Sequence, residues 1–316
     1  MAVRTELAPL EGITTWLFRR THARMFGGAD RYFTPFFSPA AEHILTKKEL
    51  RDLAPEQNAG VPTVPQVMTR RAEDFLWAAE RMAELGYGEV NLNLGCPSGT
   101  VTAKGKGAGF LLRPDELDAF LDAVFAKVCL PVSVKTRIGY RDTAELPRLL
   151  EIFHRYPICE LIVHPRLREE FYRGPVHLDA FAQALADSPV PVAYNGDLKK
   201  PEDVSDILRR FPAVSGVMIG RGAAADPALP RRLRGGPAAG REELQAFTRT
   251  LYDGYRSAYG SAGPAAQRMK ELWFYLIERF DGGEKYAKKM RRVKAPEEYE
   301  RLEAGIFQEL PLRRDA

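Results

Sequence analysis

The fold of this chain is indicated most directly by the stretch Val90-Asn91-Leu92-Asn93-Leu94-Gly95-Cys96-Pro97. Its first five residues alternate apolar and uncharged amide side chains, which is typical of a short strand inside a protein. Gly95 and Pro97 then end the strand in a turn. Amphipathic patterns cover residues 72–85 before the strand and residues 114–128 after it. A strand between two helices is the unit from which parallel sheets are built.

The same alternation of strands and helices continues along most of the chain. Eight such units in about 220 residues match the size of a (β/α)8 barrel. A doubly wound sheet is the main alternative, but its first strand usually runs into a glycine-rich turn, and here Pro9-Leu10-Glu11-Gly12 follows. We therefore predict an α/β fold of the TIM-barrel type. The predicted strands cover residues 5–10, 32–37, 63–68, 89–94, 132–137, 160–164, 190–195 and 216–219, and further helical patterns cover 143–156 and 201–211.

The composition changes near residue 235. Residues 234–240 are rich in Gly, Pro and Ala, which is typical of a linker. No strand pattern returns after them. We predict a barrel domain over residues 1–235 and a small all-helical domain over residues 240–316. The predicted helices of this second domain cover residues 242–259, 264–280, 283–293 and 296–307.

The composition of the 316 residues is that of an ordinary globular protein. Hydrophobic residues make up 45% and charged residues 28%, which excludes disordered, collagenous and coiled-coil classes. Neither a membrane span nor a secretion signal is visible, so we expect a cytoplasmic protein without membrane partners. The three cysteines, Cys96, Cys129 and Cys159, fit neither a disulfide framework nor a metal site, and no metal is expected.

Polar residues occur at the carboxyl end of strand after strand. In a parallel barrel these ends meet at one rim, where active sites are built. Seven polar strand ends at one rim are hard to explain by packing, so we expect the active site there. The segments are Pro9-Leu10-Glu11, Gln66, Asn91 to Pro97, Lys135 with Arg137, His164-Pro165-Arg166, Asn195-Gly196-Asp197 and Gly220-Arg221-Gly222.

Several of these residues suggest a phosphate-bearing cofactor with a flavin ring. Asn195-Gly196-Asp197 and Gly220-Arg221-Gly222 follow the last two strands, where barrels often bind phosphate, although each alone is equally well a simple turn. Lys135 between apolar neighbours must face the barrel mouth or join a buried ion pair. The anion of a reduced flavin is a natural partner for such a lysine. Gln66 carries an amide that can bind the ring edge, or that is satisfied within the core.

Cys96 lies in a turn near Lys135 and Arg137, whereas we expect Cys129 and Cys159 to be structural cysteines within apolar helices or strands. It is therefore a candidate reactive thiol or proton donor. The segment Lys104-Gly105-Lys106-Gly107-Ala108-Gly109 that follows lacks P-loop spacing. We expect it to be a flexible basic loop that approaches a phosphate backbone.

These motifs together resemble the tRNA-dihydrouridine synthases over nearly the whole chain. One departure is Pro165, which occupies a position where the family usually has glycine, so a backbone donor is missing there. The resemblance rests on residues 90–98 with 105–109, residues 8–12, Gln66, residues 134–137, His164 with Arg166, residues 195–197, residues 218–222 and residues 268–273.

The resemblance implies reduction of the C5–C6 double bond of uridines in the tRNA D-loop, by a monomer that uses NADPH through tightly bound FMN. Cys96 would donate the proton to C5. Implied cofactor contacts are Pro9, Leu10, Glu11, Gln66, Lys135, His164, Asn195, Gly196, Asp197, Gly220 and Arg221. Implied tRNA contacts are Asn93, Arg137, Arg166, Lys104, Lys106, Arg268, Lys288, Lys289, Arg291 and Arg292.

The net charge of +4, from 46 Lys and Arg against 42 Asp and Glu, is too small to name a partner. Its distribution is more informative, because residues 285–294 (KYAKKMRRVK) hold six cations and no anion. Alone, this run predicts a solvated helix face. A tRNA substrate makes it a phosphate-binding surface.

Two alternative functions remain open from the sequence. The first is an FMN-dependent TIM-barrel reductase of a small-molecule enone or pyrimidine, which accounts for the barrel but not for the basic helical segment. The second is a non-catalytic tRNA-binding protein, which does not require the set of Cys96, Asn93, Lys135 and His164.

Overall fold

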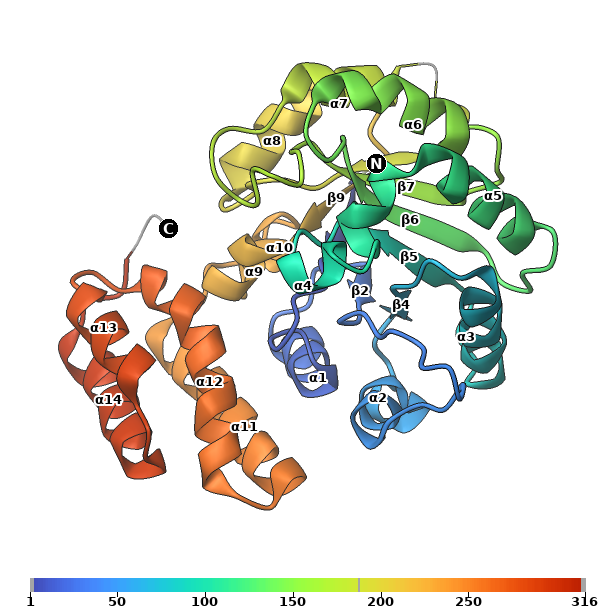
Figure 1. Cartoon of the computed structure of the whole chain (residues 1–316). Helices are drawn as coiled ribbons and strands as arrows, with labels where there is room; N and C mark the ends of the chain where they lie inside the picture. The colour runs from blue at the N-terminus through green and yellow to red at the C-terminus, as the bar shows by residue number, and fades with distance from the viewer. Residues whose placement is uncertain (1–2, 187, 314–316) are drawn as a thin grey trace.

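The computed structural model describes residues 3–186 and 188–313, and a closed barrel of parallel strands lies at its centre (Figure 1). The strand order is β3-β2-β1-β9-β8-β7-β6-β5-β4. The two ends of this order, β3 and β4, are separated only by Pro65, so the chain itself joins them. The strands are β1 (Arg4–Leu7), β2 (Arg31–Phe33), β3 (Thr63–Val64), β4 (Gln66–Val67), β5 (Val90–Leu94), β6 (Val132–Arg137), β7 (Glu160–His164), β8 (Val192–Tyr194) and β9 (Gly216–Ile219).

The predicted TIM-barrel fold is confirmed, with one local difference. The third predicted strand, residues 63–68, is two short strands, β3 and β4, that pair with different neighbours. Pro65 has no N–H to donate to a ladder, so the pairing changes sides at this residue. Every other predicted strand is present, although several are shorter than expected.

The register of the strands places polar residues from neighbouring strands at the same level. Asn93 of β5 lies beside Lys135 of β6, and Arg137 of β6 lies beside His164 of β7. Because these residues end their strands, their side chains share one rim of the barrel.

Helices cover the outside of the barrel, and the longer ones, such as α3 and α5, bury an apolar side. Among the described residues, no helix is long and apolar enough to cross a membrane. The helices of the barrel region are α1 (Trp16–Met25), α2 (Lys47–Leu53), η1 (Pro55–Gln57), α3 (Ala72–Glu84), α4 (Gly99–Thr102), η2 (Gly107–Leu112), α5 (Pro114–Phe125), η3 (Thr143–Glu145), α6 (Leu146–Phe153), α7 (Leu178–Leu185), α8 (Pro201–Arg210), α9 (Arg221–Ala225) and α10 (Leu229–Arg232).

The C-terminal segment is helical, as predicted, and forms a bundle beside the barrel (Figure 1). Phe247 of this bundle packs edge-on against Phe18 and Phe26, with ring centroids 5.7 and 5.1 Å apart. The apolar core is therefore continuous between the two parts, and their division into domains near residue 235 stays a prediction. The helices are α11 (Arg241–Tyr259), α12 (Ala262–Leu276), η4 (Ile277–Arg279), α13 (Glu284–Arg292) and α14 (Pro296–Glu309).

Candidate active site

A cavity opens at the carboxyl ends of the strands. It is lined by residues from every strand end that the sequence analysis selected. The fold therefore brings together most of the residues that the sequence analysis selected. The predicted residues that line the cavity are Pro9, Leu10, Glu11, Gln66, Asn93, Cys96, Lys135, Arg137, His164, Asn195, Gly196, Asp197, Gly220 and Arg221.

Asn93 holds the turn that carries the cysteine. Its Oδ1 accepts hydrogen bonds from the backbone N–H groups of Gly95 (3.0 Å) and Cys96 (2.9 Å). Its Nδ2 donates to Oε1 of Gln66 at 2.7 Å. Both amides are buried, so these bonds fix their orientation as well as that of the turn.

The Cys96 thiol is half-buried and free. Burial raises its pKa, although Ser98, Arg137 and Lys135 act in the opposite direction. The thiol therefore carries its proton at neutral pH, which suits a proton donor better than a thiolate nucleophile.

The glycine-rich segment after Cys96 is not the flexible loop that we expected. Residues 107–112 form the 3-10 helix η2, and Gly107 through Leu111 are buried. Gly107 has φ +55°, and a Cβ there would lie 3.0 Å from Cβ and O of Cys96. The glycine thus lets the backbone pack directly behind the cysteine. Lys104 is exposed beside this packing, and Lys106 is half-buried.

Cations dominate the cavity wall. Within the described part of the chain, Lys135 has no hydrogen-bond or ion-pair partner, and burial, helped by Arg137, lowers its pKa to about 7. Burial and the neighbouring cations lower the pKa of His164 well below its usual range. Nε2 of His164 faces Nη1 of Arg166 at 3.2 Å, and a guanidinium can only donate, so this nitrogen accepts and the proton is on Nδ1. The wall therefore attracts an anion.

Two of the predicted arginines donate hydrogen bonds to other parts of the protein. Arg137 donates from Nε to the carbonyl of Gly95 and from Nη1 to the carbonyl of Leu167, both at 2.9 Å. It lines the cavity while joining two loops. Arg166 is buried, does not line the cavity, and donates to the Asp197 carboxylate at 3.0 Å. Its geometry supports a role in holding the loop after β8 rather than the predicted contact with substrate.

The Asp197 carboxylate accepts the hydrogen bonds that hold the loop after β8. Asp197 has φ +47° and accepts from Arg166 and, at 2.7 Å, from Arg221. Burial alone would raise its pKa, but the two arginines outweigh burial and lower it. Asp197 is therefore ionised, and it offsets part of the positive charge of the cavity wall.

Tyr172 also borders the cavity, and sequence reasoning did not select it. Its ring lies 4.6 Å from the guanidinium of Arg221 and 5.3 Å from that of Arg137. It stacks on His164 with a centroid separation of 6.0 Å. The preceding Phe171 has φ +53°, a turn geometry that directs the loop back over the cavity. The aromatic pair after strand β7 was the available signal.

The remaining predicted tRNA contacts lie outside the cavity. Arg268 donates to the carbonyl of Gly12 at 2.7 Å and pairs with Glu271, so it joins α12 to the loop after β1. The four selected cations of α13 are all exposed to solvent. They form a basic surface on the helical region. Among the described residues, no group of three or more His, Cys, Asp or Glu side chains is arranged to hold a metal, and a site without metal stays a prediction.

Comparison with known structures supports the barrel fold. A 2-naphthoyl-CoA reductase in complex with 2-naphthoyl-CoA matches 74% of this chain and 50% of its own, with TM-score 0.59 and 13% identity. Morphinone reductase matches 75% of this chain and 87% of its own, with TM-score 0.54 and 13% identity. At these identities the likeness concerns the fold alone.

Comparison with known sequences gives the family. A protein of Rhodobacter capsulatus named "Probable tRNA-dihydrouridine synthase" is 33% identical over 70% of this chain and 68% of its own length. A protein of the same name from Rhizobium leguminosarum is 29% identical over 88% of this chain and 86% of its own. Residues 6–308 match the family model described as "Dihydrouridine synthase (Dus)". The chain therefore belongs to the dihydrouridine synthase family of oxidoreductases.

Proposed function

We propose that this enzyme reduces the C5–C6 double bond of uridines in the D-loop of tRNA, with tightly bound FMN and NADPH as the electron donor. The observation that carries the proposal is the Cys96 thiol at the edge of a cavity whose half-buried Lys135 has no anionic partner among the described residues. The family membership agrees with this chemistry.

The cavity lining suits FMN in charge. It holds four cations, Lys135, Arg137, Lys199 and Arg221, and two carboxylates, Glu11 and Asp197, so the excess positive charge can bind the negative charge of a flavin and its phosphate. A Cβ on Gly222 would lie 2.0 Å from the carbonyl oxygen of Leu198, so only glycine lets the loops after β8 and β9 approach so closely.

The proposed cofactor contacts follow from position in the cavity. Lys135, Gln66 and His164 would hold the flavin ring, with backbone of residues 9–11 beside it. Residues 195–197 would hold the ribityl chain and the phosphate, together with Gly220 and Arg221. When bound, FMN would take a hydride from NADPH and deliver it to C6 of the uracil.

The side chains of the protein complete the reduction. Asn93 would hold the uracil edge, because its buried amide faces the cavity from a fixed position. Hydride addition at C6 leaves a negative charge at C5 that is spread toward the neighbouring carbonyl. Cys96 would neutralise this charge by giving its proton to C5, and the thiolate would then be reprotonated from solvent. The base gains one hydride and one proton, which balances the reaction.

The helical region would hold the rest of the tRNA. It reaches the cavity mouth, because Lys199 of the cavity wall lies 3.8 Å from Glu278 of η4. A base inside a folded tRNA must turn outward to reach such a cavity. The exposed cations of α13 would bind phosphates while this occurs. We further propose that the enzyme acts as a monomer in the cytoplasm.

The decisive experiment supplies the purified protein with FMN, NADPH and either in vitro transcribed tRNA or small enones and free pyrimidines. We expect yellow protein and dihydrouridine at defined D-loop positions of the tRNA. Expression in cells that lack dihydrouridine would then map those positions. Turnover of small enones alone would overturn the tRNA substrate in favour of a small-molecule reductase. A protein that binds tRNA but cannot be loaded with flavin would overturn the enzyme proposal.

A further inference from the structure

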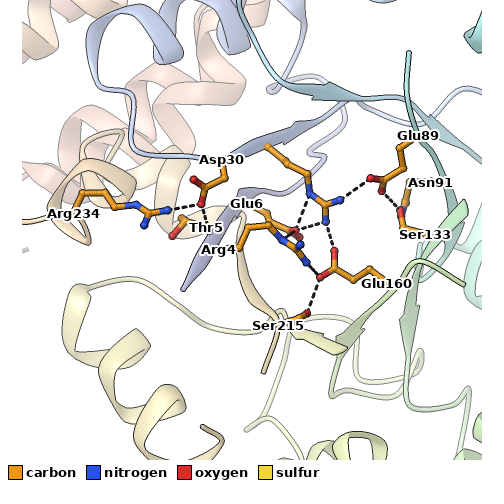
Figure 2. A network of polar contacts seen from close by, with 11 residues as sticks. Arg4, Thr5, Glu6, Asp30, Glu89, Asn91, Ser133, Glu160, Ser215 and Arg234 are labelled. Atoms are coloured by element: carbon orange, nitrogen blue, oxygen red, sulfur yellow. Dashed lines mark hydrogen bonds and ion pairs between the residues drawn. The ribbon is translucent and has the colours of Figure 1, made fainter. Parts of the chain in front are cut away.

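A chain of buried polar side chains runs through the barrel below the candidate active site. Nδ2 of Asn93 donates to Oε1 of Gln66 (2.7 Å), and Nε2 of Gln66 donates to Oδ1 of Asn91 (2.8 Å). Nδ2 of Asn91 donates to Oγ of Ser133 (2.8 Å), and the Ser133 hydroxyl donates to Oε1 of Glu89 (2.5 Å). Figure 2 shows the lower part of this hydrogen-bond chain, in which Ser133 lies between Asn91 and Glu89 at the amino-terminal end of the barrel.

The chain occupies one side of the barrel interior. Other strands contribute a buried apolar cluster, which includes Phe33, Ile162 and Met218. Gln66, Asn91 and Ser133 are completely buried, so each polar atom depends on the next one in the chain for its hydrogen bond. The amides therefore cannot turn over independently.

The direction of this hydrogen-bond chain is determined at both ends. At the upper end, the N–H groups of Gly95 and Cys96 require the oxygen of Asn93. Glu89 is paired with Arg31 (2.7 Å), and an ionised carboxylate can only accept. Ser133 must therefore donate to Glu89 and has only lone pairs left for Asn91. Asn91 must then present its NH2 to Ser133 and its oxygen to Gln66. The same reasoning gives each amide above it a single orientation.

We infer that Ser133 and Glu89 are positioning residues, which act together with the turn that carries Cys96 to hold Gln66 and Asn93 so that each offers an N–H donor, and not an acceptor, to a ligand in the cavity. Each amide nitrogen donates one of its two hydrogens within the hydrogen-bond chain, so its second hydrogen can be donated to a ligand. The oxygen of Asn93 is already used by the turn that carries Cys96. The site would thus select carbonyl acceptors on the flavin edge and on the base, an assignment that rests on the proposed function.

A matched pair of serine variants tests this inference. Ser215, like Ser133, donates its hydroxyl to a glutamate at the same end of the barrel, in this case to Glu160 at 2.7 Å, but it is not part of the chain (Figure 2). Ser133→Ala and Ser215→Ala remove the same group, and Ser133→Thr restores a hydroxyl at the first position. For each variant we would measure the dissociation constant and visible absorption spectrum of FMN, and kcat and KM with tRNA.

We expect Ser133→Ala to weaken FMN binding about fivefold, to shift the flavin absorption bands, and to lower kcat about tenfold with a smaller change in KM. Ser215→Ala should leave all four quantities near those of the unaltered protein, and Ser133→Thr should recover most of the loss. Equal behaviour of the two alanine variants would overturn the inference. If the unaltered protein does not reduce tRNA, the proposed function fails, but FMN affinity and spectrum still decide whether Ser133 acts on the cavity.

Discussion

The two ends of the barrel hold similar numbers of charged side chains but arrange them differently. At the amino-terminal end, Arg4 and Arg31 lie among the carboxylates of Glu6, Glu89 and Glu160, and every one of these charges has an opposite partner (Figure 2). Burial raises the pKa of Glu6, against the influence of Arg31. This end resembles a structural ion network, as expected for the face of a barrel that does not hold the active site.

At the carboxyl-terminal end, cations outnumber their partners. Lys135, Arg137, Lys199 and Arg221 line the cavity with two carboxylates: Asp197, which pairs with Arg166 and Arg221, and Glu11, which pairs with Lys48. Keeping a lysine such as Lys135 unpaired costs stability, which is expected where a ligand supplies the missing anion. We therefore expect the charges at the amino-terminal end to stabilise the fold and the charges at the carboxyl-terminal end to bind a ligand.

The largest expected effect belongs to the carboxyl-terminal end. Cys96→Ala should lower the rate of uridine reduction by about 10²- to 10⁴-fold, because the proton for C5 must then come from water. NADPH-dependent bleaching of the flavin should stay normal, since this half of the reaction does not use the thiol. Cys129→Ala, at an exposed cysteine outside the cavity, is the matched control. An active Cys96→Ala variant would show that another group donates the proton.

At the amino-terminal end, we expect a substitution to lower the stability of the fold. Arg31→Met leaves Glu6 and Glu160 buried with only Arg4 to pair them. Removing one partner of a buried ion network costs about 3 kcal/mol of unfolding free energy. Arg148→Met breaks two solvent-exposed ion pairs instead, with Asp115 and Glu151, and should leave the unfolding free energy nearly unchanged.

Urea unfolding at neutral pH measures both effects. FMN affinity below the transition should be unchanged in Arg148→Met, and in Arg31→Met it should fall by less than in Ser133→Ala, because Arg31 also pairs with Glu89. A large loss of FMN affinity in Arg31→Met, with little loss of stability, would remove the contrast between the two ends.

The active-site end was largely predictable from the sequence, and the other end was not. Parallel strands bring their carboxyl ends together, so polar residues such as Asn93, Lys135 and His164 could be placed in one site from strand boundaries alone. The charged cluster needs partners from strands far apart in sequence, which only barrel closure brings together. Its signal was present, since Arg4, Arg31 and Glu160 each begin a strand.

Loop geometry accounts for the other differences. The fold of the segment after Cys96 depends on how Gly107 packs, and a glycine-rich composition does not distinguish close packing from flexibility. Tyr172 reaches the cavity because Phe171 adopts a left-handed backbone, which no residue type predicts for a bulky side chain. Arg166 was predicted to contact substrate, but its guanidinium donates a hydrogen bond to Asp197 in the next loop instead.

The pH dependence of FMN binding sharpens the comparison further. The pKa of Lys135 is about 7 in the protein without ligand, so the ammonium is mostly charged at pH 6 and mostly neutral at pH 9. An anionic ligand prefers the charged form, and binding above pH 7 must take up a proton. The FMN dissociation constant should therefore rise about tenfold between pH 7 and pH 9.

Lys135→Met should bind FMN about tenfold more weakly at pH 6.5 and should lose most of this pH dependence. Lys127→Met, at an exposed lysine on the barrel surface, should behave like the unaltered protein. Fluorescence titration of FMN measures both properties. The same pH profile in Lys135→Met and in the unaltered protein would assign the titration to another group and would leave Lys135 without its proposed anion.

The smallest effect is expected on α13, where charges face solvent. Lys288 and Arg292 are exposed and one helical turn apart, so they can contact the same stretch of phosphates. Changing both to Gln should weaken tRNA binding about fivefold and reduce its dependence on salt by one to two released ions, with kcat unchanged. Lys127→Gln with Arg209→Gln removes the same charge from the barrel surface. If both pairs weaken binding equally, α13 is a solvated face, and net charge alone attracts the tRNA.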